Sequence, residues 1–517
     1  MWRFCYNGEA TVEQMALLKV LSDEDIERIH LSALSILWRT GVEVREEQAF
    51  GILKKAGCPT HGKTVRIPPH LVEEAVRTCP RTFTLYGRDP NFKVRLEGRR
   101  VNYEPMIGRL NILDLETGER RRTTLEDVAN LVRVADALEH YTLLHSGAIM
   151  PHIEGVPDPV AHVHGYLTSV RNSTKVIKGV VRGKEKARDC IRMAMAIAGG
   201  EENLKRRPNI FTTCNVISPL EYMVEQTEGL IEYAKMGLPV DIASEPQAGA
   251  TSPVTLAGTL AQQTAEILGM VVIAQLVNPG TPVLMGTVAA AMDLRNGTIA
   301  LGGVEAALLN VAHAQMARFY GIPSRGTGSN TESKLLDMQA GYEKAITLLL
   351  PALAGINMIF YPGTMDHALT VSLESLVIDH EICGMIDRLL RGVHVTDETI
   401  GLEVIEKGEG IDWASAEMLA FASLLAEGVP VRLSQVTYLT DARSPTEIHR
   451  YNRERTITVS ANLAKGAALG EVNTAVRKAI GERVPFPEGY HIPETGMVKM
   501  MTESFQSLFQ ALLLSVI

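Results

Sequence analysis

PSRGTGSNTESKLLDMQAGYEKAITLLLPALAGINMIFYPGTMDHALTVSLESLVIDHE, residues 323–381, alternates strand-like and helix-like patterns around many polar side chains. PSRGTGS has the pattern of a strand that enters a glycine-rich loop, and SKLLDMQAGYEKAITLLLPALAG carries apolar residues at helical spacing. INMIFYPG is a short apolar run that stops at Pro362 and Gly363. Since polar residues follow both expected strands, this stretch is predicted to form one wall of an active site.

The same strand-and-helix unit recurs upstream. The expected buried strands cover residues 143–150, 174–181, 209–216, 238–244, 281–288, 323–329 and 356–362, with helical patterns such as EKARDCIRMAMAIAG between them. Strands that alternate with crossover helices indicate a parallel sheet, and this many units favour an α/β fold of the (β/α)8 TIM-barrel type. Chemistry in that fold takes place where the strands end. The strand-end candidates are Thr212, Thr213, Asn215, Ser218, Glu245, Gln247, Thr287, Ser329, Asn330 and Tyr361.

Three regions are expected along the chain. Residues 1–140 are predicted to form an N-terminal helical and β subdomain, because LSDEDIERIHLSALSILWRTGVEV has an amphipathic helical pattern and a strand pair with a capped helix follows. Residues 141–407 are predicted to form the barrel. Residues 408–517 form a C-terminal extension of atypical pattern.

Composition and charge exclude several classes of protein. The formal net charge is −9 without a long basic run, so no nucleic-acid partner is expected. The six cysteines contain no CxxC pair, and the N-terminal residues lack a signal-peptide pattern, which predicts a cytoplasmic protein. Every long apolar run is interrupted, so no membrane association is expected.

Several separated blocks resemble the trimethylamine methyltransferase family in the same order. They are IERIHLSALSILWRTGVEV, EDVANLVRVADAL, NVISPL, ESKLLDMQAGYEKA and IDHEICGMIDRLLRGV, and the resemblance covers about residues 17–407. It implies a (β/α)8-barrel enzyme that moves a methyl group from a methylated amine to the cobalt(I) of a corrinoid, cobalamin, carried by a cognate partner protein. The resemblance therefore implies no tightly bound cofactor and no metal site in this chain. A homo-oligomer is a further expectation.

One departure from the family bears on the substrate. Archaeal trimethylamine enzymes carry pyrrolysine in a barrel loop that corresponds to about residues 361–368, where this chain has YPGTMDHA. Relatives without pyrrolysine resemble glycine betaine methyltransferases, so the resemblance implies a quaternary amine similar to glycine betaine. Trimethylamine, a tertiary amine, stays open as the alternative substrate.

A quaternary nitrogen already carries its positive charge and leaves as a neutral amine, so it needs orientation more than activation. A few aromatic faces would hold the cation at about 0.5–2 kcal/mol each, whereas a stronger cage would stabilise the ground state and slow transfer. The cage candidates are Phe360, Tyr361, Tyr342 and Tyr222. Core packing is an equal alternative for Phe360 and Tyr342.

Other polar residues complete the predicted site. The carboxylate of a betaine would accept hydrogen bonds from His367 or from Asn215, Ser218, Gln339 and Asn330. Glu343 and Asp337 could orient His367 and so join it in catalysis, or could serve only as helix caps. No residue of this chain is required as the nucleophile.

The C-terminal extension resembles other proteins. Residues 408–434 are similar to a segment of the thiamine-dependent subunit of 2-oxoglutarate dehydrogenase, and residues 435–517 are similar to resistance-nodulation-division efflux transporters. Neither fragment carries the functional motifs of its parent family. Two hypotheses of different class remain: a corrinoid-dependent methyltransferase, or a non-catalytic or misfolded fusion that retains only a cation-binding barrel. A transporter is a distant third.

Overall fold

A computed structural model of the 517-residue chain describes residues 17–402 without residue 151, together with residues 405, 449–451 and 454–456. The chain divides into two compact units, residues 7–410 and residues 1–6 with 411–517. In the second unit, β22 (His449–Tyr451) pairs antiparallel with β23 (Glu454–Thr456). All the elements below belong to the first unit.

Eight short strands form one parallel sheet that closes into a barrel. In chain order they are β6 (Asn102–Glu104), β9 (Leu143–Leu144), β10 (Val176–Lys178), β11 (Ile210–Val216), β13 (Val240–Ser244), β15 (Val283–Thr287), β18 (Ser324–Thr327) and β19 (Met358–Phe360). β19 pairs with β6, and the Thr142 amide donates to the Tyr103 carbonyl at 3.1 Å, which joins β6 to the chain entering β9. The predicted (β/α)8 barrel is therefore confirmed.

The first barrel strand lies before the expected domain boundary. β6 belongs to the segment assigned to the N-terminal subdomain, and it hydrogen-bonds in register with β19, with Glu104 opposite Phe360. The seven strands expected from the sequence account for the other seven barrel strands. A three-residue strand gives too short a pattern for its role to be read from the sequence.

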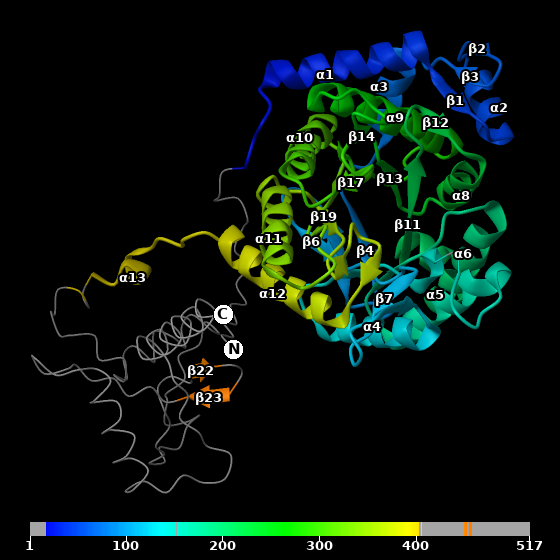
Figure 1. The fold of residues 1–517 in the computed structure, drawn as a ribbon. Helices are drawn as coiled ribbons and strands as arrows, with labels where there is room; N and C mark the ends of the chain where they lie inside the picture. The colour runs from blue at the N-terminus through cyan, green and yellow to red at the C-terminus, as the bar shows by residue number, and fades with distance from the viewer. Residues whose placement is uncertain (1–16, 151, 403–404, 406–448, 452–453, 457–517) are drawn as a thin grey trace, which may run out of the picture. The chain divides into compact units, whose positions relative to one another are not determined.

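Helices surround the barrel strands (Figure 1). They are α4 (Leu125–Ala137), α5 (Ala161–Asn172), α6 (Lys184–Ala198) with α7 (Glu201–Arg206), α8 (Val224–Lys235), α9 (Leu256–Val277), α10 (Val304–Tyr320), α11 (Met338–Leu353) and α12 (Leu373–Leu390), followed by α13 (Asp397–Ile400). Side chains cap several of them: Thr124 begins α4, Thr255 begins α9 and Ser372 begins α12. These caps satisfy amides that the first helical turn leaves free.

The N-terminal elements cover one side of this ring and close the bottom of the barrel. They are α1 (Asp23–Ser35), η1 (Ile36–Thr40), β1 (Val42–Val44), α2 (Glu47–Lys55), β2 (Thr60–His61), β3 (Thr64–Val65), α3 (Pro69–Thr78), β4 (Phe83–Tyr86) and β5 (Lys93–Leu96). α1 and α3 lie against α9 (Figure 1). Leu85 of the β4–β5 hairpin packs with Phe211 and Met358 from the barrel strands, so the amino-terminal end of the barrel is a closed apolar plug.

Helix α9 is apolar on all sides because it is covered on all sides. Among the described residues it is the one helix with the length and hydropathy of a membrane span, and 89% of that apolar window is buried inside the protein. Burial between the barrel and the N-terminal helices accounts for its composition.

Short β-strands lie in the segments that follow the carboxyl ends of the barrel strands. They are β7 (Asn111–Leu113), β8 (Arg120–Arg122), β12 (Glu221–Tyr222), β14 (Gln247–Ala248), β16 (Ala290–Asp293), β17 (Thr298–Ala300), β20 (Thr364–Met365) and β21 (Thr370–Val371), with the short helices η2 (Gly147–Ile149) and η3 (Asp158–Val160). β20, β21, β7 and β8 form one sheet, and β14, β16 and β17 form another. These two sheets form the rim of the barrel mouth, whereas β12 pairs with β1 of the N-terminal elements.

Candidate active site

Four charged side chains meet inside the barrel below its mouth. Lys178 on β10 places Nζ 2.7 Å from Oε1 of Glu104 on β6, and Arg325 on β18 places Nε 3.4 Å from Oδ2 of Asp241 on β13. Each side chain is at most 2% exposed. The two ion pairs make the barrel interior polar and electrically balanced. Removing these four charges from water costs free energy that their pairing only partly offsets.

The Phe360 ring is already surrounded by protein groups. Lys178 Nζ lies 4.5 Å and the Arg325 guanidinium 4.3 Å from its centroid, while the Tyr361 ring stacks on it at 4.4 Å. His145 is a fourth neighbour, with ring centroids 5.2 Å apart. Phe360 therefore binds the protein's own cations and positions Tyr361.

Tyr361 occupies the strained position where β19 ends. Its φ of 99° is unusual for a residue with a bulky side chain, and such strain is often found at functional sites. The Thr364 hydroxyl donates to the Tyr361 carbonyl at 2.9 Å and supports this conformation. The Arg109 guanidinium, in the loop after β6, lies 5.4 Å from the Tyr361 ring centroid. Burial raises the pKa of the Tyr361 hydroxyl, so it is a neutral hydrogen-bonding group at neutral pH.

His145 follows β9 and is held as a neutral imidazole. Burial lowers its pKa well below the ordinary value, and the positive charges of Lys178, Arg109 and Arg325 lower it further. The Gly108 amide donates to Nδ1 at 3.2 Å, so the ring proton lies on Nε2. His145 is therefore a hydrogen-bond donor that cannot act as a cation at neutral pH.

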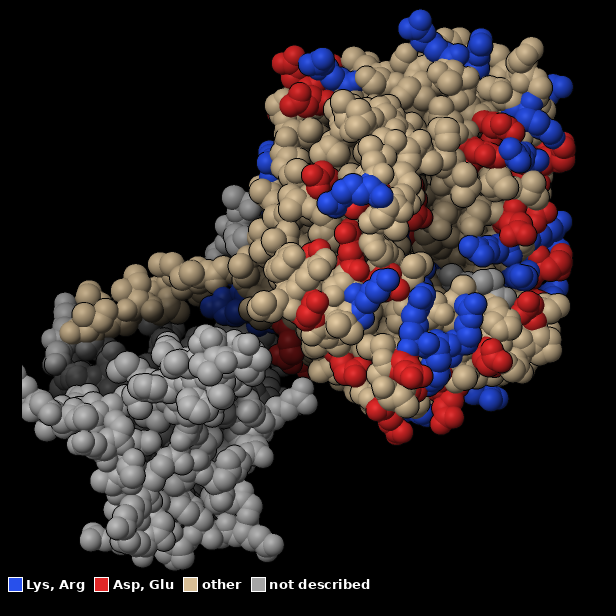
Figure 2. Space-filling view, in the orientation of Figure 1, with Lys and Arg blue, Asp and Glu red and all other residues tan. Residues whose placement is uncertain are grey.

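Glu245 follows β13 and projects into the mouth. Its side chain is accessible to solvent, although protein encloses it closely enough that desolvation raises the pKa of its carboxyl. Arg109 and Arg325 oppose that shift. In space-filling view the face toward the viewer is hollowed near its centre, with acidic and basic side chains around the opening (Figure 2).

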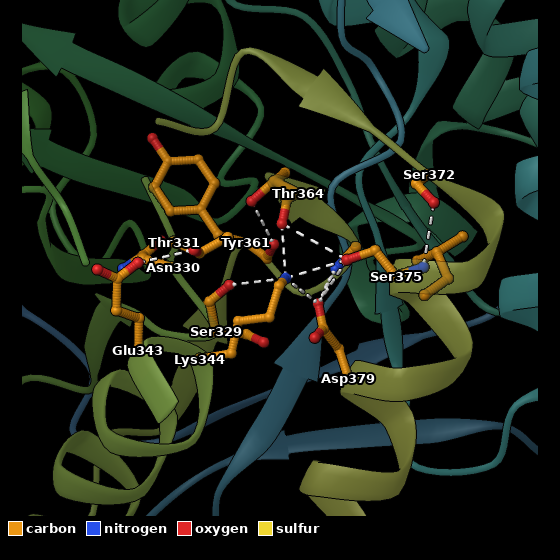
Figure 3. Close-up of polar contacts among 12 residues, drawn as sticks. Ser329, Asn330, Thr331, Glu343, Lys344, Tyr361, Thr364, Ser372, Ser375 and Asp379 are labelled. Carbon is orange, nitrogen blue, oxygen red and sulfur yellow. Dashed lines mark hydrogen bonds and ion pairs between the residues drawn. The ribbon is translucent and has the colours of Figure 1, made fainter. Parts of the chain in front are cut away.

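A buried lysine ties together the loops that follow β18 and β19. Lys344 Nζ on α11 donates to the Thr364 carbonyl at 2.6 Å, the Ser375 hydroxyl at 3.0 Å and Asp379 Oδ2 at 2.8 Å (Figure 3). The Ser329 carbonyl is a fourth acceptor at 3.3 Å. These contacts join α11 and α12 to both loops, so they fix the backbone on which Tyr361 and the residues after β18 sit.

Asn330 is the candidate polar residue with the most unused hydrogen-bonding capacity. It is 2% exposed, its amide N–H donates to the Thr347 hydroxyl at 2.9 Å, and neither Oδ1 nor Nδ2 has a partner among the described residues. The neighbouring Ser329 hydroxyl is likewise buried without one. Both residues lie on the same side of the Lys344 network as Tyr361 (Figure 3). Buried polar atoms of this kind need a water or ligand partner.

The predicted catalytic residues lie behind this loop. Glu343 accepts hydrogen bonds from the Thr331 hydroxyl at 2.7 Å and from Gln339 Nε2 at 2.9 Å. Asp337 caps α11 by accepting from the Ala340 amide, which lowers the pKa of its carboxyl. Asp337 thus has the capping role that the sequence allowed as an alternative, whereas Glu343 lies inside α11, caps no helix and also accepts from the Glu332 amide of the loop after β18.

His367 lies in the turn between β20 and β21. Its Nδ1 is 3.1 Å from the Ile299 carbonyl on β17, and its φ of 53° continues a left-handed run. The hydrogen bond connects two rim hairpins. The structure therefore brings His367 to the rim, and within the described part of the chain it makes no hydrogen bond with Glu343 or Asp337.

Four other candidates are spread around the barrel. Tyr342 is 58% exposed on α11, and Tyr222 is fully buried with its hydroxyl donating to the Glu266 carbonyl. The Ser218 hydroxyl donates to Glu266 Oε2 at 2.8 Å behind the barrel strands. Asn215 is half-buried on β11, with its backbone amide bonded to Gln226. Tyr342 and Tyr222 therefore do not join Tyr361 in one cage.

The sequence left several mouth residues unassigned. Glu245 was already among the strand-end candidates, because it directly follows an expected strand, but Arg109 and Glu104 depend on β6, which was not recognised as a barrel strand. Lys178 and Arg325 occupy expected strands. Alternation along those strands is the signal that places them inside the barrel.

Two parts of the chain match two different protein families. The family model described as trimethylamine methyltransferase matches residues 6–412, and the AcrB/AcrD/AcrF family model matches residues 415–517. The second match confirms the resemblance to efflux transporters, and most of it lies outside the described residues. The similarity of residues 408–434 to a dehydrogenase subunit also lies outside them and stays a prediction.

Curated relatives agree with the first match. Glycine betaine methyltransferase of Desulfitobacterium hafniense strain Y51 is 33% identical over 90% of this chain and 97% of its own length. Trimethylamine methyltransferase MttB of D. hafniense is 36% identical over 77% of this chain and 80% of its own. MttB of Methanosarcina barkeri is 34% identical over 75% and 80%.

Among solved structures, the monomethylamine methyltransferase MtmB of Methanosarcina barkeri aligns with 80% of this chain and 92% of its own, with 12% identity and a TM-score of 0.47.

Proposed function

Because the chain belongs to the trimethylamine methyltransferase family and is a methyltransferase, we propose that its methyl donor is a quaternary amine similar to glycine betaine. The acceptor in this proposal is a corrinoid bound to a separate cognate protein, and the enzyme works in the cytoplasm. The observation that carries the proposal is that an exposed carboxylate, Glu245, and a strained aromatic residue, Tyr361, each directly follow a barrel strand at the mouth.

The mouth suits a permanent cation. A quaternary ammonium group cannot donate a hydrogen bond, so it is recognised by negative charge and by aromatic faces. Glu245 supplies charge, and the Tyr361 ring supplies a face that Phe360 holds in place by stacking. The Tyr361 side chain is only 5% exposed. One such ring with one carboxylate is a weak cage, which avoids over-stabilising the charge that disappears as the methyl group leaves.

The partner's corrinoid supplies the cobalt(I) nucleophile that accepts the methyl group, while the N–C bond electrons stay on nitrogen and the donor leaves as a neutral tertiary amine. This chain has to bind the donor, exclude water and present one N–CH3 bond to the open mouth. The apolar plug formed around Phe211 closes the opposite end of the barrel, so approach is possible from the mouth alone.

Asn330 and Ser329 are proposed to bind polar parts of the donor. Their side chains are buried without partners and lie in the loop that Lys344 anchors. Glu343 and Asp337 are positioning residues in this proposal, because Glu343 accepts from the Glu332 amide of that loop and Asp337 caps α11, the helix that carries Lys344. His367 is proposed to fix the rim hairpins around the opening.

The test is methyl transfer by the purified full-length chain to chemically reduced cobalamin or to the cognate corrinoid protein. Glycine betaine, carnitine, choline and trimethylamine would be compared as donors, and the demethylated amine would be quantified by mass spectrometry. We expect dimethylglycine from glycine betaine at the highest rate. Transfer from trimethylamine alone would contradict the quaternary substrate, and no transfer from any donor would support the non-catalytic fusion.

A further inference from the structure

We propose that Arg109, His145 and Arg325 form a carboxylate-binding subsite in the barrel mouth, so the enzyme selects quaternary amines that also carry a carboxylate. This inference rests on the proposed function and deepens it. It moves the carboxylate-binding role from His367, where the sequence placed it, to residues that follow or occupy β6, β9 and β18.

The first argument is the electric field at His145. Burial lowers the pKa of this imidazole, and three cations, Lys178, Arg109 and Arg325, lower it further. Lys178 and Arg325 are each paired with a carboxylate, so an anion beside His145 would be stabilised chiefly by Arg109 and by the donors that Arg325 leaves free. The ring offers its Nε2 proton there, because Nδ1 accepts from the Gly108 amide.

The second argument is unused donor capacity. Arg325 is 2% exposed, yet neither its Nε nor its Nη1 has a hydrogen-bond partner in the described part of the chain. Nε lies 3.4 Å from Asp241 Oδ2, an ion pair whose geometry is too poor for a hydrogen bond. Arg109 Nε is also buried without a partner. An arginine fork with free donors is the group best shaped to receive a carboxylate.

Lys178 is a less suitable ligand because its charge is already used. Its Nζ lies within 2.8 Å of both carboxylate oxygens of Glu104. Asp241 likewise accepts from the Thr213 hydroxyl at 2.8 Å. Arg109 and Arg325 are therefore the cations left with donors to offer.

The mouth holds groups of both signs, which fits a zwitterion. Arg109, His145 and Arg325 are the donors available to a carboxylate, and Glu245, whose charged form Arg109 and Arg325 favour, is the carboxylate available to an ammonium group. A donor with an ammonium group at one end and a carboxylate at the other satisfies both sides. Choline would place a hydroxyl where the arginines need an anion, and trimethylamine would leave that side without any partner.

The experiment is calorimetric titration of the full-length protein with glycine betaine and with choline. We expect the wild-type protein to bind glycine betaine at least about 10-fold more tightly, and Arg109→Met to weaken glycine betaine binding by about 10- to 100-fold while changing choline affinity less than about 3-fold. Arg109→Lys should restore part of the loss, since it keeps the charge but not the fork. Arg192→Met, on the exposed face of α6, is the matched control and should change neither affinity.

Several results would overturn the subsite. They are equal losses for both ligands in Arg109→Met, unchanged betaine affinity in that variant, or a wild-type protein that binds choline as tightly as betaine or binds neither. Thermal melts of each variant show whether a loss reflects unfolding, in which case Arg109→Lys decides. Failure of the methyl-transfer assay with intact discrimination in binding would contradict the proposed function and leave the subsite standing.

Discussion

Two buried cations in this protein, Lys344 and Arg325, differ in how completely their nitrogens are hydrogen-bonded. Lys344 on α11 has four oxygen acceptors within 3.3 Å and pairs with Asp379, whereas Arg325 on β18 leaves two nitrogens without hydrogen bonds and pairs with Asp241 at 3.4 Å. Both cations are almost completely buried. The Lys344 ammonium is thus fully hydrogen-bonded and anchors two loops, although Asp379 Oδ1 keeps no partner, whereas the Arg325 guanidinium keeps donors free for the proposed ligand.

The largest effect should come from removing Lys344 and its hydrogen bonds. Lys344→Met leaves Asp379 as an unpaired buried carboxylate and frees the loops after β18 and β19, so we expect a loss of about 3–5 kcal/mol in the free energy of unfolding. Urea denaturation measures it, with exposed Lys334→Met as the control. A loss below about 1 kcal/mol would mean that the network does not anchor the loops.

A substitution of Arg325 should change the affinity for the ligand more than the free energy of unfolding. Arg325→Lys keeps a positive charge beside Asp241 but removes the planar fork, so we expect about 1–2 kcal/mol less binding free energy for glycine betaine. Unfolding free energy should fall by less than the Lys344→Met variant shows. If the two variants show the same balance of stability and binding losses, the contrast between the two cations is wrong.

A pH titration sharpens the assignment of Glu245. Because desolvation raises the pKa of its carboxyl, the charge that attracts the cation is present above that raised pKa and is lost as the pH falls through it. We therefore expect KM for glycine betaine to rise on the acidic side at a higher pH than an ordinary glutamate would give. Glu245→Gln should raise KM about 10-fold at neutral pH, equivalent to about 1.4 kcal/mol, and abolish this acidic dependence. Exposed Glu305→Gln should leave both unchanged.

The smallest effects separate the two tyrosines predicted for the cage. Tyr361→Ala should weaken glycine betaine binding by about 0.5–2 kcal/mol, the range of a cation–π contact. Tyr342→Ala should change it by less than about 0.5 kcal/mol, since this ring is mostly exposed on α11. Calorimetric titration of both variants gives the comparison, and equal losses would return Tyr342 to the site.

Local patterns in the sequence were sufficient for much of the fold. Strand-and-helix alternation gave the barrel, and Asp337 was named as a possible helix cap, which is the position it occupies at the start of α11. These features depend on neighbours within a few residues. The resemblance of separated blocks added the family, which the comparisons confirmed.

The site itself depended on contacts that no local pattern contains. Glu104 meets Lys178 across 74 residues of sequence, and Arg109 comes to Tyr361 only because β6 closes the barrel beside β19. In the sequence, Tyr342 and Tyr222 are aromatic cage candidates on the same grounds as Tyr361. In the folded protein, Tyr342 is mostly exposed to solvent and Tyr222 is fully buried in the core. The sequence alone thus determined the alternation of strands and helices, the chain's family and which residues follow each strand. Only the closed barrel decided which side chains face the same interior, because it brings the ends of distant strands together.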